Sequence, residues 1–327
     1  MSDNFREMAN DYNNIDIFYN GASTNAQRTR KLVQRRFSHW ENGPRVEYHQ
    51  TPPNIDDFKE IVVNAIEAKD GDTITGSISG DGSLNHHMLI KQDPSVPAIV
   101  KDSPIWTPGG GNAINLFKAL TDRIDYRHPE QVIKTGTISE FYPLHIKSIN
   151  GKGELEDMFA ASIFSVGAMA LAASYLNDSE YRQSHLRNRK YGEIITDPIR
   201  VLKSLKQTRP YIYYDKRDGF KQAYDILFIN SPKIAKVIHA KDVKLTGPAY
   251  KLEIKDRQVR EVVSSIARLA IGKANGEYLT KPYSFTVLSE DVLAQVDGEN
   301  WKLDVGTSLE VGYASTPIKV VTTLKNP

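Results

Sequence analysis

The chain of 327 residues carries 42 Lys and Arg against 40 Asp and Glu, and the net charge of +2 argues against a general nucleic-acid-binding protein. The absence of cysteine excludes disulfides, thiolate metal sites and cysteine nucleophiles, and it agrees with a reducing, cytoplasmic setting. The polar N-terminus does not resemble a signal peptide, no apolar run reaches the ~18 residues of a membrane-spanning helix, and the length suits two domains.

Alternating strand and helix patterns open the chain. Residues 15–19 predict a buried strand that ends at the turn Asn20-Gly21-Ala22-Ser23, and residues 28–40 then predict a helix with arginines on one face. Residues 46–49 predict a second strand, and Asn54 is a candidate N-cap for the helix after it. The apolar stripe of that helix consists of Phe58, Ile61, Val62, Ala65 and Ile66. This alternation predicts an α/β domain with a parallel sheet and flanking helices.

Two glycine-rich turns follow later strands of this domain. Residues 73–78 predict a strand before Gly80-Asp81-Gly82, and a strand at residues 105–106 precedes Gly109-Gly110-Gly111. Each turn leads towards a helical pattern, where backbone N–H groups can bind an anion. Neither turn is a GxxxxGK[ST] loop or a clean GxGxxG motif, and each alone is more typical of a tight or flexible turn. Two such turns at strand ends of one domain could hold one polyphosphate between them, with Asp81 as a ligand for its magnesium ion.

The pattern changes after about residue 135, where strand-like segments predominate. These segments lie at residues 141–146, 211–214, 225–230, 241–245, 250–254, 284–288, 293–296, 308–313 and 318–323. Residues 159–176 predict a strand that turns into a buried helix, and residues 259–271 predict a further helix. The sequence therefore predicts an α/β domain over residues 1–135 and a β-rich domain over residues 136–327, whose last strands could return to the first domain.

Four short motifs, taken in order, resemble those of a known enzyme family. They are Asn20-Gly21-Ala22-Ser23, Ser79-Gly80-Asp81-Gly82-Ser83-Leu84-Asn85, Thr107-Pro108-Gly109-Gly110-Gly111-Asn112 and Val296-Asp297-Gly298-Glu299. Over almost the whole chain, their order and spacing resemble the diacylglycerol kinase catalytic-domain family, which includes bacterial diacylglycerol kinases, sphingosine kinases and ceramide kinases. Alone, the last motif is more typical of a β-turn between two strands, and the upstream motifs favour the functional interpretation.

The resemblance implies an ATP- and Mg²⁺-dependent lipid kinase, with ATP between an NAD kinase- and diacylglycerol kinase-like α/β domain and a β-sandwich-like domain for the lipid. The residues that it implies at the nucleotide are Asn20, Gly21, Ala22, Ser23, Thr51, Ser79, Gly80, Gly82, Ser83, Asn85, Gly109, Gly110, Gly111 and Asn112. Asp297 and Glu299 would approach the lipid hydroxyl, one of them as general base, and Asp81 would organise magnesium or share the proton transfer. The sequence leaves open which carboxylate takes the proton.

Three positions depart from the family's pattern. His86 and Ala113 stand where an acid is common, and Gly110 stands where Thr is usual. These departures leave open a nucleotide- or lipid-binding protein that has lost catalysis. A nicotinamide-nucleotide kinase is a further alternative, because that family shares a Gly-Asp-Gly turn, although the late Asp-Gly-Glu motif favours the lipid kinase.

The segment of residues 182–209 is basic and contains few acids. Within it, Asp197 and Pro198 are typical of a helix start, and apolar residues follow at Ile199, Val201, Leu202 and Leu205. Such a helix could dock on an anionic bilayer or, equally, lie as a solvated helix with its apolar side in the core. We expect a cytoplasmic protein that is peripherally associated with a membrane and has no nucleic-acid partner. A homodimer is open, since a sheet edge in the β-rich half could pair two copies.

Overall fold

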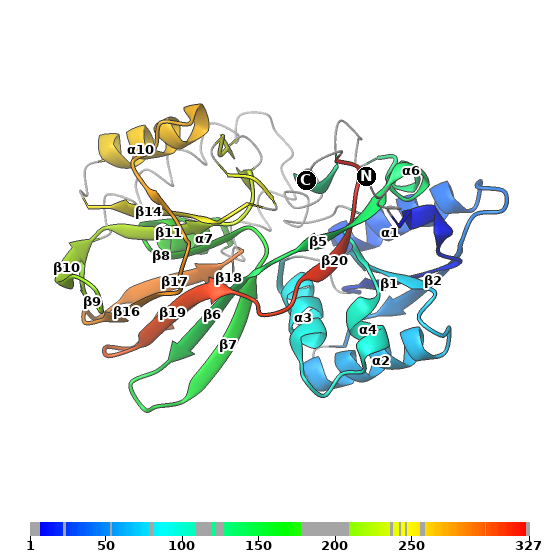
Figure 1. The fold of residues 1–327 in the computed structure, drawn as a ribbon, viewed down its shortest axis with the longest axis horizontal. Helices are drawn as coiled ribbons and strands as arrows, with labels where there is room; N and C mark the ends of the chain where they lie inside the picture. The colour runs from blue at the N-terminus through cyan, green and yellow to red at the C-terminus, as the bar shows by residue number, and fades with distance from the viewer. Residues whose placement is uncertain are drawn as a thin grey trace, which may run out of the picture. The chain divides into compact units, whose positions relative to one another are not determined.

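The chain divides into two compact units, shown as a computed structural model in Figure 1. The structure describes residues 7–21, 24–52, 54–78, 81–108, 119–121, 127–177, 209–235, 238–241, 243–245, 247–255, 259–297 and 299–324. Residues 1–143 and 314–327 form the first unit, and residues 144–313 form the second. The sequence places the boundary at residues 135/136, whereas the structure places it after Pro143 and returns the chain to the first unit after Tyr313.

The first unit is built on a six-stranded sheet with the order β2-β1-β3-β4-β20-β5. Its strands are β1 (Asn14–Tyr19), β2 (Arg45–Gln50), β3 (Thr73–Ile78), β4 (Ile105–Trp106), β5 (Thr137–Phe141) and β20 (Ile318–Thr322). The pairings are parallel from β2 through to β20, and β5 pairs antiparallel with β20. The predicted parallel α/β domain is therefore confirmed.

Helices cover both faces of this sheet (Figure 1). They are η1 (Ala9–Asp11), α1 (Thr24–Phe37), α2 (Ile55–Glu67), α3 (Asp81–Gln92), α4 (Ala98–Asp102) and α6 (Pro129–Thr135). Successive side chains of a strand point to opposite faces. Ile15 and Ile17 of β1 therefore share a core with Val33 of α1, whereas Phe18 shares a core with Phe58 of α2.

The N-cap of α2 agrees with the sequence-based prediction. The Asn54 side chain accepts a hydrogen bond from the Asp56 backbone N–H at 2.8 Å. We expect Asn54→Ala to lower the free energy of unfolding by about 1 kcal/mol, because an N–H group of the first turn loses its acceptor. Denaturant unfolding measures this loss. Asn54→Asp keeps an acceptor and is the matched control, so an equal loss in both variants would contradict the capping role.

The second unit consists mainly of two six-stranded sheets. The first has the order β10 (Gly219–Ala223), β9 (Tyr211–Asp215), β16 (Tyr283–Val287), β19 (Ser308–Tyr313), β6 (Leu144–Ile149) and β7 (Leu155–Ala160). The second has the order β15 (Glu277–Tyr278), β14 (Tyr250–Ile254), β11 (Asp225–Ile229), β8 (Ile163–Gly167), β17 (Val292–Val296) and β18 (Glu299–Leu303). One core joins Tyr213 and Phe285 of the first sheet to Phe164 and Phe228 of the second. This confirms a β-rich, sandwich-like C-terminal unit.

Two helices and a short hairpin complete the second unit. They are α7 (Ala168–Asn177), α10 (Val259–Ile271) and the pair β12 (Lys233–Ala235) and β13 (Ile238–His239). The predicted change from strand to helix occurs at Gly167, whose φ of +118° and lack of a side chain let the backbone pass close to the Tyr224 carbonyl. The strand predicted at residues 241–245 is wrong for its described residues, because the Val243 N–H bonds the Ala240 carbonyl in a turn. The predicted helix within residues 182–209 lies outside the described ranges up to residue 208.

Candidate functional site

Two predicted nucleotide-binding residues meet at the carboxyl ends of β1 and β2. These strands and β3 end at the same position along the sheet, since Tyr19 at the end of β1 is in register with Gln50 of β2 and Ile78 of β3. Just beyond them, the Asn20 N–H donates to the Ile78 carbonyl at 3.4 Å, and the Thr51 N–H donates to the Tyr19 carbonyl at 2.9 Å. The Thr51 hydroxyl also donates to the Tyr19 carbonyl, at 3.2 Å. Asn20 and Thr51 thus lie at the sheet edge where α/β proteins bind ligands.

Gly21, in the turn after β1, lies too close to Gln50 for any larger residue. A Cβ atom at this position would lie 2.5 Å from the side-chain amide of Gln50. The Gly21 carbonyl accepts a hydrogen bond from Nε2 of Gln27 on α1 at 2.6 Å. The turn after β1 is therefore held between the sheet and α1, and glycine at this position has a packing role.

The helix α3 begins at Asp81, directly after the predicted glycine turn. The backbone at Asp81, Gly82, Ser83 and Asn85 is helical, so N–H groups of a first helical turn, which have no acceptor within the helix, lie where the sequence predicts an anion site. The side chains of these residues lie outside the described part of the structure. The predicted residues Ala22, Ser23, Ser79, Gly80, Gly109, Gly110, Gly111 and Asn112 also lie outside it.

His87 packs α3 against the sheet. Its ring contacts Phe18 and Phe58 edge to face, with ring centroids 5.6 Å and 5.9 Å apart. Burial, with a smaller contribution from the charge of Lys91, lowers the pKa of His87 to about 3. Neither ring nitrogen has a hydrogen-bond partner among the described residues. This neutral, buried imidazole agrees with a packing role behind the predicted phosphate-binding turn.

Asp297 organises a turn in the second unit. Its Oδ1 accepts hydrogen bonds from the N–H groups of Ser162 and Ile163, both at 2.8 Å, and its Oδ2 accepts one from Ala161 at 2.7 Å. Its own N–H donates to the Ile163 carbonyl at 2.9 Å. The turn at Ala161 and Ser162 carries the chain from β7 in one sheet to β8 in the other. Asp297 therefore fixes this crossing to the end of β17.

Opposing effects act on the pKa of Asp297: burial favours the neutral carboxyl, and hydrogen bonds from the backbone favour the charged carboxylate. Burial raises the pKa of its carboxyl to about 6, the three backbone N–H bonds act in the opposite direction, and the charge of Glu299 adds to the increase. Asp297 has a φ of +48°, a conformation that Asp tolerates and that suits the two-residue hairpin in which Val296 pairs with Glu299. The predicted β-turn is thus present, and it holds a largely enclosed carboxylate.

Glu299 is the contrasting member of the motif. It is the first residue of β18 and is exposed. Its backbone pairs with Val296 in the hairpin, but no residue that the structure describes forms a hydrogen bond or an ion pair with its carboxylate. Glu299 therefore presents its carboxylate beside Asp297, at the hairpin turn between β17 and β18, which we call the Asp297 turn. The oxygen atoms of this carboxylate can accept a proton from a bound molecule.

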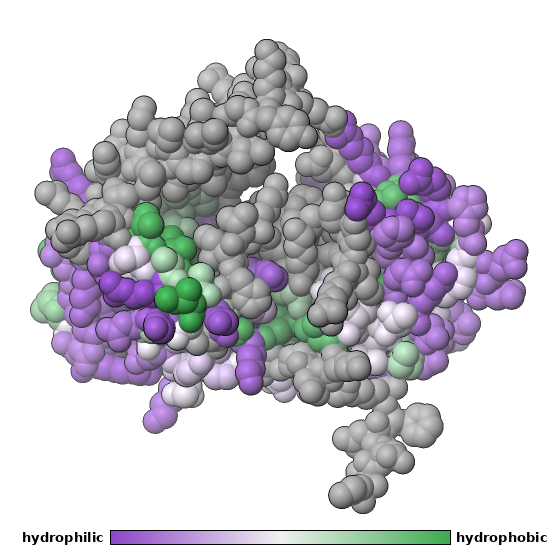
Figure 2. Space-filling view, turned by 90° about the horizontal axis from the view of Figure 1, so that it is seen from above, coloured by the Kyte–Doolittle hydropathy of each residue, from purple (hydrophilic) through white to green (hydrophobic). Residues whose placement is uncertain are grey.

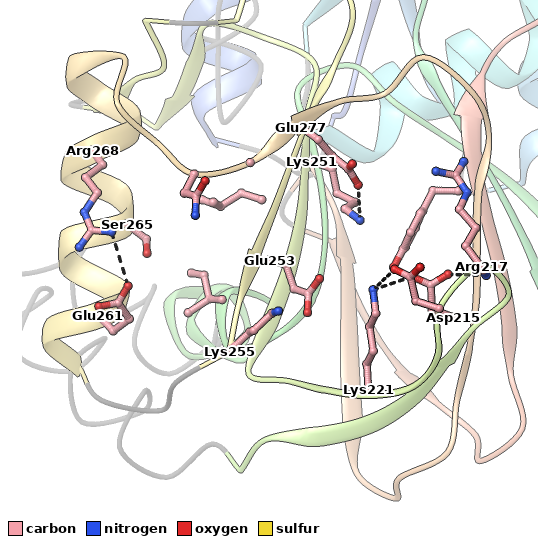
Figure 3. Close-up of a pocket in the computed structure, with 16 residues that line it drawn as sticks. Asp215, Arg217, Lys221, Lys251, Glu253, Lys255, Glu261, Ser265, Arg268 and Glu277 are labelled. Atoms are coloured by element: carbon pink, nitrogen blue, oxygen red, sulfur yellow. Dashed lines mark hydrogen bonds and ion pairs between the residues drawn. The ribbon is translucent and has the colours of Figure 1, made fainter.

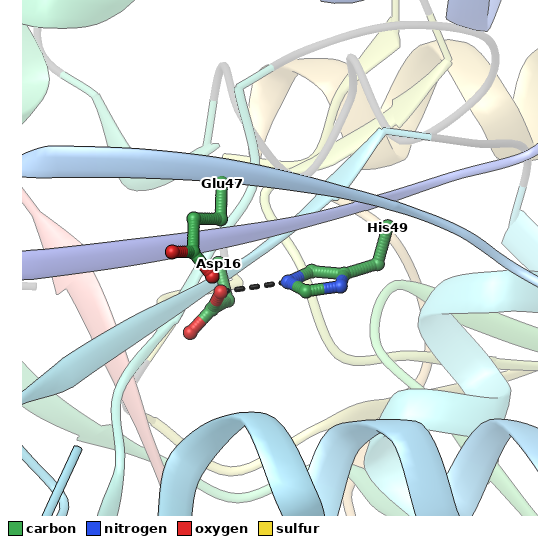
Figure 4. A group of neighbouring side chains, drawn as sticks. All are labelled: Asp16, Glu47 and His49. Atoms are coloured by element: carbon green, nitrogen blue, oxygen red, sulfur yellow. Dashed lines mark hydrogen bonds and ion pairs between the residues drawn. The ribbon is translucent and has the colours of Figure 1, made fainter. Parts of the chain in front are cut away.

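A charged cluster that the sequence analysis missed lies within the first unit (Figure 4). Nε2 of His49 lies 2.7 Å from Oδ1 of Asp16, and Glu47 completes a group in which one ligand atom per residue lies within 4.8 Å of the others. The Lys69 ammonium donates to both oxygens of Asp16 at 2.7 Å and to Glu47 at 3.0 Å. The signal that could have found it is Asp16, a charge between the buried Ile15 and Ile17 of β1.

This cluster has the residue types of a metal site, but Lys69 already supplies its positive charge. We therefore expect Lys69→Met to lower the free energy of unfolding by about 3 kcal/mol, because Asp16 is fully buried and would lose its cationic partner. Thermal and denaturant unfolding measure this loss, and Lys69→Arg is the matched control that keeps the charge. A stable Lys69→Met protein would show that another cation balances Asp16.

A cavity of about 750 Å³ lies in the second unit, between α10, β14 and the β9–β10 hairpin (Figure 3). Its charges pair with one another: Lys221 bonds Asp215 at 3.1 Å and Asp218 at 2.5 Å, and Lys251 bonds Glu277 at 2.6 Å. Five cationic and five acidic side chains line it. The cavity thus has no net charge to attract a phosphate, and Asp297 and Glu299 are not among its lining residues.

The parallel α/β unit followed by a two-sheet β unit is a fold shared with structures of diacylglycerol kinase and NADH kinase. A structure of a diacylglycerol kinase from Bacillus anthracis matches with a TM-score of 0.60 and 12% identity, over 95% of this chain and 97% of that chain. The structure of yeast NADH kinase complexed with NADH matches with a TM-score of 0.52 and 11% identity, over 97% and 85%. No protein-family model and no curated protein matches the sequence. The resemblance predicted from the four motifs is confirmed at the level of the fold.

Proposed function

We propose that this protein is an ATP- and Mg²⁺-dependent lipid kinase that phosphorylates a hydroxyl of diacylglycerol or a related lipid. The observation that carries the proposal is the Asp297 turn, which sets an exposed Glu299 beside an enclosed carboxylate in a chain with a diacylglycerol kinase fold. Phosphoryl transfer requires positioning, charge neutralisation and an acceptor for the hydroxyl proton. Glu299 can supply the last of these.

In this mechanism Glu299 is the general base. Its carboxylate takes the proton of the lipid hydroxyl while that oxygen bonds to the γ-phosphorus and the bond from phosphorus to the β–γ bridging oxygen breaks, which releases ADP. Asp297 acts as a positioning residue, because its two oxygens already accept three backbone N–H bonds. Its role is to hold the turn from which Glu299 projects.

The first unit would bind the nucleotide. Asn20 and Thr51 lie together at the strand ends, and the start of α3 offers N–H groups to phosphate oxygens. Asp81 at that helix start would hold the magnesium ion, which when bound neutralises phosphate charge. Gly110, Gly111 and the neighbouring residues of the second glycine turn remain part of this proposal.

Labelled ATP, Mg²⁺ and vesicles that contain diacylglycerol, sphingosine bases or a total lipid extract test the proposal. We expect labelled phosphate in one lipid class and much less transfer by Asp81→Asn. The absence of transfer to every lipid would overturn it. If ATP binds in equilibrium dialysis and no acceptor is phosphorylated, the departures at His86, Gly110 and Ala113 have removed catalysis.

A second candidate is a nicotinamide-nucleotide kinase. It is favoured by the match to yeast NADH kinase, whose structure contains NADH. The same assay with NAD⁺ and NADH as acceptors separates the two activities. Phosphorylation of either dinucleotide with no lipid product would establish this second function.

The lipid substrate also implies a place of action. No helix within the described ranges combines the length and the apolar character that a membrane crossing requires. We propose that a cytoplasmic protein meets its substrate from the membrane surface, with the basic residues 182–209 as one contact and with homodimerisation as a further property to be tested by sedimentation. No nucleic-acid partner is part of this proposal.

A further inference from the structure

Helix α10 carries apolar side chains on two faces. Its inner face packs on the second sheet of the β-rich unit through Val262, which is fully buried. On the other side, Val263 and Ile271 keep 50% and 57% of their surface exposed, and Ala267 and Ala270 are also exposed. A surface helix usually places polar side chains outward. The packing of the unit itself therefore does not account for this second face.

These four outward residues form one continuous stripe. Val263, Ala267 and Ile271 follow one another at four-residue intervals, and Ala270 lies three residues after Ala267; such intervals bring side chains to the same side of a helix. Figure 2, which views the molecule from above, shows a hydrophobic area on the side where Figure 1 places α10. We call these residues the outer stripe of α10.

Two exposed lysines, Lys241 and Lys273, lie at the C-terminal end of α10, where the outer stripe ends. Gly272, with a φ of +72°, ends the helix, and the Lys273 N–H caps it by donating to the Arg268 carbonyl at 2.8 Å. The Lys241 N–H donates to the Leu269 carbonyl at 3.2 Å, which brings the segment before β14 to the last turn of α10. Lys241 and Lys273 are exposed, as is Lys244 three residues further along that segment.

Glu261 is the acidic residue that α10 itself contributes. Arg268 lies 3.8 Å from Glu261 of the same helix and donates to the Ser264 hydroxyl at 3.3 Å. The Glu261 carboxylate is therefore paired with Arg268 and lies more than one helical turn away from Ile271. The end of the stripe at Ile271 and Lys273 thus combines an exposed aliphatic side chain with ammonium groups.

We propose that the outer stripe of α10, together with Lys241, Lys244 and Lys273, docks on the surface of an anionic lipid bilayer. Val263 and Ile271 enter the boundary between head groups and acyl chains, and the ammonium groups bind lipid phosphates. Four small side chains are too few for a stable protein interface, which buries about 800 Å² on each partner. A bilayer requires no such shape complementarity. The inference rests on the proposed function, since a kinase for an embedded lipid works at a bilayer surface.

The test is sedimentation of the full chain with vesicles of phosphatidylcholine, with and without phosphatidylglycerol, in the absence of ATP. We expect the wild type to bind the anionic vesicles and Val263→Gln/Ile271→Gln to bind them about tenfold more weakly, because two apolar anchors are lost. Lys241→Gln/Lys273→Gln should also weaken binding and reduce its dependence on salt. Phe220→Gln, at a position 76% exposed on β10, is the matched control and should bind like the wild type.

The outcomes separate docking from catalysis. Equal vesicle binding by wild type and Val263→Gln/Ile271→Gln, or an equal loss in Phe220→Gln, overturns the docking surface. An unchanged melting temperature confirms that the α10 variant is folded, as expected for exposed side chains. Kinase activity on diacylglycerol in detergent micelles tests the proposed function separately. Activity there without any effect of the α10 substitutions on vesicle binding removes the docking inference alone, whereas docking without activity removes the kinase alone.

Discussion

Glu299→Gln is expected to reduce the rate of phosphoryl transfer to lipid by about 10²–10⁴-fold, because the amide cannot accept the hydroxyl proton. The melting temperature is expected to stay unchanged, since the Glu299 side chain is exposed and is bound to no described residue. The lowered rate should appear in kcat and in kcat/KM alike, as for a group that acts in the transition state. Single-turnover assays with labelled ATP measure the rate of phosphoryl transfer, and thermal unfolding of the same preparation measures the melting temperature.

Glu156→Gln is the matched control for this substitution. Glu156 is an exposed carboxylate on β7 of the same unit, so it tests for a general effect of lost negative charge. Its activity should equal that of the wild type. If Glu299→Gln retains full activity while an Asp297 variant with an unchanged melting temperature is inactive, the roles of the two carboxylates are the reverse of those proposed.

Local sequence patterns predicted much of the fold because helices, strands and caps depend on interactions between residues that are close in the sequence. The alternation of strands and helices up to β4 at residue 106, the Asn54 cap and the helix after Gly80 depend on neighbouring residues. The amphipathic pattern of residues 259–271 predicted α10 with its bounds. Each of these features needs only periodicity or a capping residue, both of which can be read within one turn or one strand.

The remaining features depend on contacts between distant parts of the chain. The sequence segment 141–146 reads as one strand, yet β5 ends at Phe141 in one unit and β6 begins at Leu144 in the other. The pattern of a strand predicts its conformation but not the sheet in which it pairs. The bond between Lys69 and Asp16 likewise joins residues 53 positions apart, so no local pattern reveals it. The candidate site follows the same rule, since motif order suggested Asp297 and Glu299 but only the contacts with residues 161–163 distinguish them.

Asp297→Ala is expected to lower the free energy of unfolding of the second unit by roughly 3–6 kcal/mol, because the N–H groups of Ala161, Ser162 and Ile163 lose their acceptors together. Alanine also disfavours the φ of +48° at this position. Activity should fall as well, since the turn that carries Glu299 is no longer fixed. Denaturant unfolding measures the loss, and a change below about 1 kcal/mol would contradict the positioning role.

The pH dependence of stability gives an independent measure of Asp297. Its pKa in the folded protein, about 6, lies above the ordinary value of 3.8, so between these values the folded state binds more protons than the unfolded state. The contribution of Asp297 to stability is therefore largest below pH 4 and decreases as the pH rises to about 6. Asp297→Asn cannot titrate, so the difference in unfolding free energy between wild type and this variant should decrease over the same range. A difference that instead grows with pH would mean that the three N–H bonds outweigh burial, which would place the folded pKa below 3.8 and make Asp297 a permanently charged anchor that leaves proton transfer to Glu299.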